Sequence, residues 1–139
     1  MNAPAFSIFS AVSELLVTAG VLWIVWRNWT RRTFPVPLLL VVALFEALVN
    51  VLYMANRASH AASGRDAIST GMKLFYAGHG ILSLLAYIVF VILALLAWQE
   101  QRAGRWFFRD HPAITWTFVV TWLVSIVSGE AIFVLRYLR

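Results

Sequence analysis

The sequence of 139 residues has no cysteine and few charged residues, and each shortage excludes a class of protein. Without cysteine the chain forms no disulfides, no Cys-ligated zinc or iron–sulfur centre and no thiol redox pair. Charged residues make up 12% of the chain, whereas ordinary soluble domains contain about 25%. Hydrophobic residues make up 62%, which is more apolar surface than a core of this size can bury. These numbers exclude a soluble globular enzyme and a disordered chain, and they indicate an integral membrane protein.

Four long apolar runs divide the chain. They span about Phe6 to Trp26, Val36 to Met54, Leu74 to Trp98 and Ile114 to Leu135. Each run is roughly 19–25 residues long, and a helix needs about 20 residues to cross the hydrocarbon core of a bilayer. The alternating segments of about ten residues that are typical of membrane β-barrels are absent. The sequence therefore predicts an all-α integral membrane protein, in which residues 1–139 form one antiparallel up-down-up-down bundle of four transmembrane helices.

Basic residues flank the apolar runs, so the net charge of +5 indicates membrane orientation and not a nucleic-acid partner. The connections after the first and third runs hold six arginines, whereas the opposite side holds five basic residues. Cytoplasmic loops are enriched in Lys and Arg close to the membrane. We therefore expect a multi-pass protein of the inner or cytoplasmic membrane with both termini outside the cytoplasm. The longest connection, from Ala55 to Lys73, is expected on that same side.

Five polar side chains lie inside the apolar runs, although ionisable groups in membrane spans are costly and usually functional. Every run contributes at least one of them. Measured from the ends nearest the chain termini, they lie about 6–12 Å deep at 1.5 Å per residue. The sequence therefore predicts one polar layer in one half of the bilayer. Its members are Glu14, Glu46, Asn50, His79 and Glu130.

Helical spacing supports this layer on three helices and weakens it on the fourth. In the first three runs the members of the layer repeat with other polar residues at helical spacing, as Glu14 does with Ser10 and Thr18. Such spacing places side chains on one face of a helix. In the fourth run Glu130 does not share the polar face that contains Ser125. Glu130 is consequently the member of the layer with the poorest support.

Three carboxylates gathered in a low dielectric cannot all stay ionised without a positive charge, and the four runs contain no Lys or Arg. A functional solution is a proton relay, a small-ligand site, or a metal site with His79, Glu46 and Glu14 as candidate ligands. No run carries the Glu-x-x-His pair that di-iron bundles use. A structural solution is a set of protonated glutamates that hydrogen-bond between helices. Both solutions stay open at this point.

Haem is a further alternative, because membrane bundles hold it between histidines. His79 is the one histidine inside a run, while His60 lies in the longest connection and His111 lies at the opposite membrane edge. Ligation by two histidines in one layer is therefore excluded, and His79 paired with Met54 or Met72 stays open. The chain has no phosphate-binding loop, no H-E-x-x-H motif and no Ser/His/Asp set that indicates an enzyme.

The second half of the chain resembles a known family. The segments that carry the resemblance are LFYAGHGILS at 74–83, Arg109-Asp110-His111, Trp116-Thr117-Phe118 and Val127-Ser128-Gly129. They are similar to the CtaM-like four-helix membrane family, which is linked to the assembly of haem–copper terminal oxidases in bacteria.

The resemblance implies a non-enzymatic accessory protein, either an assembly factor or a peripheral subunit, with the bilayer and oxidase subunits as partners. His79 and His111 fall where the family has histidines. Arg31-Arg32-Thr33 and Tyr53-Met54-Ala55 stand where further histidines are expected. The alternative is a membrane module that binds haem, quinone, a metal ion or a proton in the Glu/His layer.

Overall fold

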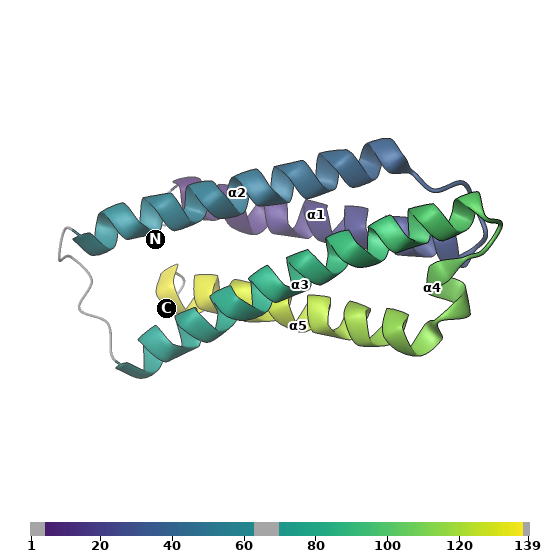
Figure 1. Cartoon of the computed structure of the whole chain (residues 1–139). Helices are drawn as coiled ribbons and strands as arrows, with labels where there is room; N and C mark the ends of the chain where they lie inside the picture. The colour runs from purple at the N-terminus through teal and green to yellow at the C-terminus, as the bar shows by residue number, and fades with distance from the viewer. Residues whose placement is uncertain (1–4, 63–69, 138–139) are drawn as a thin grey trace.

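The computed structural model describes residues 5–62 and 70–137, which form four long helices and one short one. Each long helix contains a stretch of 20 to 33 residues that is apolar enough to cross a membrane. Consecutive long helices run in opposite directions (Figure 1), so the predicted all-α four-helix transmembrane bundle is confirmed. The long helices are α1 (Ala5–Trp29), α2 (Val36–Ala62), α3 (Thr70–Arg102) and α5 (Pro112–Tyr137).

The helices extend beyond the apolar runs. α3 covers Thr70–Arg102, where the sequence predicted residues 74–98, and α2 continues past Met54 to Ala62. Polar residues can continue a helix outside the hydrocarbon core, because each added residue gains one backbone hydrogen bond without a new nucleation step. The predicted connection from Ala55 to Lys73 is therefore wrong at both of its ends. Its middle, residues 63–69, lies outside the described residues.

The sequence did not predict the short helix α4 (Phe107–Asp110), which closes the bundle at the end opposite the start of α1 (Figure 1). Phe107 and Phe108 are buried. The Asp110 carboxylate accepts a hydrogen bond from the Trp106 N–H at 2.9 Å. Asn28 of α1 is fully buried, and its Oδ1 accepts the Phe108 N–H at 3.0 Å. Because a buried N–H without an acceptor costs about 1–3 kcal/mol, this bond fixes α4 against the end of α1.

The middle of the bundle is filled by an aromatic plug, which consists of Phe90, Phe118 and Trp122. The ring centroids of Phe90 lie 6.2 Å from Phe118 and 5.6 Å from Trp122. All three side chains are buried, and the Trp122 Nε1–H donates to Thr18 Oγ1 at 3.1 Å. The indole N–H therefore has a protein acceptor, and the three rings fill the centre of the bundle.

Two local contacts hold α2 against α1 and α3. A Cβ atom on Gly20 of α1 would lie 2.7 Å from Val42 Cγ2, so the glycine allows α1 and α2 to approach closely. The Tyr87 hydroxyl of α3 donates to the Ala43 carbonyl of α2 at 3.1 Å. These contacts hold α2 against the rest of the bundle.

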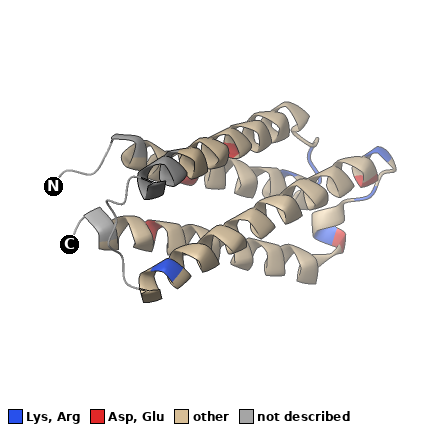
Figure 2. Cartoon of the chain, turned by 60° about the vertical axis from the view of Figure 1, so that its left-hand side comes forward, with Lys and Arg blue, Asp and Glu red and all other residues tan. Residues whose placement is uncertain are grey.

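Basic residues gather at the α4 end of the bundle (Figure 2), as expected from an antiparallel arrangement of the two short connections. Two of them lie over tryptophan rings, with Arg32 5.0 Å from the Trp26 centroid and Arg102 5.3 Å from that of Trp98. Tryptophan with arginine is typical of membrane–water interfaces. The arginines in and beside these connections are Arg27, Arg31, Arg32, Arg102, Arg105 and Arg109.

Candidate functional site

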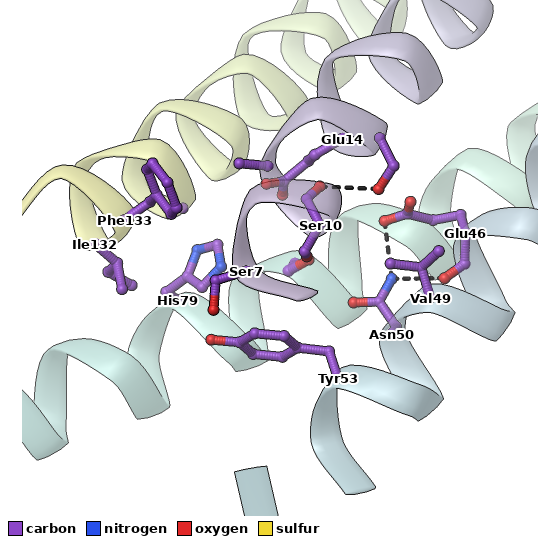
Figure 3. Close-up of a pocket in the computed structure, with 14 residues that line it drawn as sticks. Ser7, Ser10, Glu14, Glu46, Val49, Asn50, Tyr53, His79, Ile132 and Phe133 are labelled. Atoms are coloured by element: carbon purple, nitrogen blue, oxygen red, sulfur yellow. Dashed lines mark hydrogen bonds between the residues drawn. The ribbon is translucent and has the colours of Figure 1, made fainter. Parts of the chain in front are cut away.

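The four long helices enclose a polar cavity at the end of the bundle opposite the arginines. Its volume is about 90 Å³, and all four helices contribute to its wall. Figure 3 shows side chains from several helices around this common space. The lining residues with polar side chains are Ser7, Ser10, Ser13, Glu14, Glu46, Asn50, Tyr53, His79 and Ser83.

The cavity brings together four of the five residues of the predicted polar layer, namely Glu14, Glu46, Asn50 and His79. They come from α1, α2 and α3. Glu14 of α1 and Glu46 of α2 thus line one common space. None of the lining residues is Lys or Arg. The cavity is therefore an acidic site with one imidazole and no permanent positive charge.

Asn50 holds the Glu46 carboxylate within α2. Its Nδ2 donates to Glu46 Oε1 at 2.8 Å and to the Glu46 carbonyl at 2.9 Å (Figure 3). The two residues are four positions apart, which places them one above the other on a helix. Because Glu46 is buried, this amide supplies a hydrogen bond that water would otherwise give.

The hydrogen bonds of Ser128 in α5 determine the tautomer of His79. The Ser128 hydroxyl donates to the Ser125 carbonyl at 2.7 Å, and His79 Nδ1 lies 2.8 Å from the same oxygen. A hydroxyl has one hydrogen to donate. Since Ser128 donates that hydrogen to Ser125, it accepts a hydrogen bond from His79, so the network assigns a hydrogen to Nδ1.

Gly129 allows His79 and Glu14 to lie close against the backbone of α5. A Cβ atom at this position would lie 3.0 Å from His79 Cε1 and 3.2 and 3.3 Å from the two carboxylate oxygens of Glu14. The imidazole of α3 and the carboxylate of α1 thus both pack on the bare backbone of α5. The sequence analysis placed Ser128 and Gly129 in a family-like segment and did not identify either as a site residue.

Glu130 does not line the cavity, which corrects the prediction that it shares one site with the other four. Gly129 takes the cavity-facing position on α5, and the next residue is turned by about 100° around a helix. One oxygen of Glu130, Oε1, is buried, and no residue that the structure describes hydrogen-bonds to it. Glu130 therefore flanks the site, as its helical phase indicated.

The geometry does not fit a metal or a haem. In the ranges 5–62 and 70–137, no three His, Cys, Asp or Glu side chains lie close enough to hold one ion. The cavity has room for several water molecules, each of which takes about 30 Å³ in the liquid. Pockets for larger ligands measure about 300–1,000 Å³. Met54, one candidate haem ligand, is 63% exposed.

The other two histidines do not join the site. His111 is exposed at the opposite end of the bundle, where its ring lies 4.8 Å from that of Phe107. The side chain of His60 lies outside the part of the chain that the structure describes. His79 is thus the histidine that the described residues place at the cavity.

No family model matches the chain, and no curated protein or solved structure matches it either. The chemistry of the cavity and the sequence resemblance are therefore the grounds for a functional proposal.

Proposed function

We propose that the cavity binds protons within the membrane and is the functional site of a non-enzymatic membrane protein. The observation that carries the proposal is the meeting of Glu14, Glu46 and His79 in one water-sized cavity whose lining has no Lys or Arg. Carboxylates at close range in a low dielectric need a positive charge nearby. A proton supplies that charge without the further ligands that a metal ion requires.

We infer that protons reach this site from the end of the bundle at which it lies. The aromatic plug fills the centre, and Phe107, Phe108 and the buried Asn28 close the arginine end. Proton conduction along polar groups needs a continuous chain of donors and acceptors. The protein therefore takes up and returns protons on one side of the membrane and does not conduct them across.

Infrared spectra of the purified protein in detergent test this proposal directly. At neutral pH we expect a carboxylic-acid C=O band that disappears or weakens in Glu14→Gln and in Glu46→Gln, because these two carboxylates share the cavity. The matched control is Glu100→Gln, since Glu100 lies near the arginine end, where it pairs with Arg105 at 3.6 Å. Absence of the band from the unaltered protein, or an equal band in all variants, contradicts proton binding.

A second proposal is a role beside a haem–copper respiratory oxidase, as an assembly factor or a peripheral subunit. Its support is the sequence resemblance together with one contact. His79 belongs to the first family-like segment, and Ser128 and Gly129 belong to the last; these segments meet at the cavity.

The oxidase role predicts a loss of oxidase activity in cells that lack this protein. We expect the unaltered gene to restore oxygen consumption by their membranes, and His79→Ala to fail because it removes the imidazole from the cavity. Gly80→Ala is the control, since a Cβ atom there meets nothing within 4 Å. Full oxidase activity without the protein contradicts this role.

We also propose that both termini lie outside the cytoplasm, in the inner or cytoplasmic membrane. The six arginines at the α4 end support this orientation, because cytoplasmic loops are enriched in Lys and Arg close to the membrane (Figure 2). In this orientation the polar cavity lies in the outer half of the membrane.

A further inference from the structure

An apolar groove lies between α3 and α5, in the half of the bundle nearer the arginines, and it shares no residue with the polar cavity. Its volume is about 470 Å³. Its wall is apolar except for two threonines. The residues that matter for the argument are Ala86, Val89, Ala113, Thr117 and Thr121.

Short side chains leave this groove open. Ala86 of α3 and Ala113, Thr117 and Thr121 of α5 line it with little volume of their own. Longer side chains at these positions would close the gap between the two helices. Within a bilayer an open apolar gap of this size is filled by lipid, because water has no polar partners there.

The length of the groove matches one leaflet. Ala113 lies in the first turn of α5 at the arginine end, and Thr121 lies eight residues further toward the centre. Eight residues span about 12 Å at 1.5 Å per residue, and half of a 30 Å hydrocarbon core is about 15 Å. The groove thus runs from the interface to near the bilayer centre, as an acyl chain does.

Arg109, in the short helix α4, comes shortly before the end of α5 that lines the groove. Arg109 is exposed and precedes Ala113 by four residues. The nearby Asp110 carboxylate accepts the Trp106 N–H, and Arg105 pairs with Glu100. Among the described residues, Arg109 has no ion-pair partner. Its guanidinium is therefore available to a phosphate at the membrane surface.

We propose that this groove holds one acyl chain of an anionic phospholipid whose headgroup phosphate binds Arg109. The apolar wall of the groove contacts the acyl chain, and the guanidinium of Arg109 favours a headgroup with negative charge. This site does not depend on the proton-binding cavity, so either proposal can fail without the other.

Native mass spectrometry of the whole protein in detergent tests the lipid site, with phosphatidylglycerol and phosphatidylcholine of the same chains as probes. We expect one phosphatidylglycerol to be retained in preference to phosphatidylcholine. Arg109→Gln should weaken phosphatidylglycerol binding about fivefold, which is the contribution of one basic residue near a membrane surface. Arg31→Gln, in the other arginine-rich connection, is the control for loss of charge.

A second pair of variants tests the groove itself. Thr117→Trp should abolish retention of the lipid because the indole occupies the groove, whereas Val120→Trp should not. Both positions are exposed on α5, and Val120 does not line the groove. Equal retention of the two lipids, or equal binding by Thr117→Trp and Val120→Trp, overturns the proposal. If Thr117→Trp fails to fold, the comparison of Arg109→Gln with Arg31→Gln decides the matter, because both residues are exposed outside the packed core.

Discussion

Replacing Phe90 by alanine should lower the free energy of unfolding by about 3 kcal/mol, the lower end of the range for Phe→Ala in packed cores. Phe90 is 1% exposed and contacts two aromatic rings of α5, so its removal leaves a void that neighbouring side chains cannot fill. The lower end applies because lipid tails are as apolar as a protein core, and the loss then comes from packing. Reversible unfolding in detergent micelles measures it.

The matched control for Phe90→Ala is Leu84→Ala on the same helix. Leu84 is 59% exposed and faces lipid, so we expect its truncation to change the free energy of unfolding by less than about 1 kcal/mol. Similar losses from the two variants would contradict the aromatic plug, because they would mean that Phe90 is no better packed than a residue on the outer surface.

The number and direction of the membrane-spanning helices could be predicted because the bilayer sets them. Four apolar runs of about 20 residues allow little besides four spans, and short connections make neighbours antiparallel. The helix ends could not be predicted in this way. α3 continues to Arg102 through polar residues. Hydropathy predicts the apolar part of such a helix and not the residue at which the helix ends outside the membrane. The adjacent Phe107 and Phe108 in a polar connection were the available signal for the buried α4.

The depth of the polar residues in the membrane was the feature of the sequence that predicted the site. Polar side chains at one depth on four packed helices lie close together. This feature identified Glu14, Glu46, Asn50 and His79, which the cavity brings together. Depth does not say which way a residue faces. Glu130 lies at the same depth in the membrane as the other four residues, but its position around the axis of α5 turns it away from the cavity. For this residue the helical spacing predicted the outcome better than the depth did.

The roles of Ser128 and Gly129 could not be predicted from the sequence, because they depend on how α5 packs on α1 and α3. A serine in a membrane helix usually bonds to its own backbone, and Ser128 does so with the Ser125 carbonyl. Its second contact, with His79, exists only because α3 lies alongside. Likewise, glycine in a membrane helix indicates a close contact without naming the partner.

Replacing Gly129 by leucine should close the polar cavity and lower the free energy of unfolding by about 2–3 kcal/mol, the upper part of the range for overpacking. The first carbon of the new side chain would already lie 3.0 Å from the His79 ring and 3.2 Å from the Glu14 carboxylate. The rest of the leucine must then displace one of them. Unfolding in detergent gives the energy, and the imidazole signals of His79 in nuclear magnetic resonance report loss of its contact with Ser128.

Gly78→Leu is the matched control for Gly129→Leu, because Gly78 is exposed on α3 and a Cβ atom there meets nothing within 4 Å. Leucine is a better helix former than glycine by up to about 1 kcal/mol, so this variant should be neutral or slightly more stable. Gly129→Ala should fall between the two, since a single methyl group requires its neighbours to move by only a few tenths of an ångström. If Gly129→Leu unfolds like Gly78→Leu and leaves the His79 signals unchanged, then α5 does not present Gly129 to the cavity, and the packing of the His79 imidazole and the Glu14 carboxylate on Gly129 is contradicted.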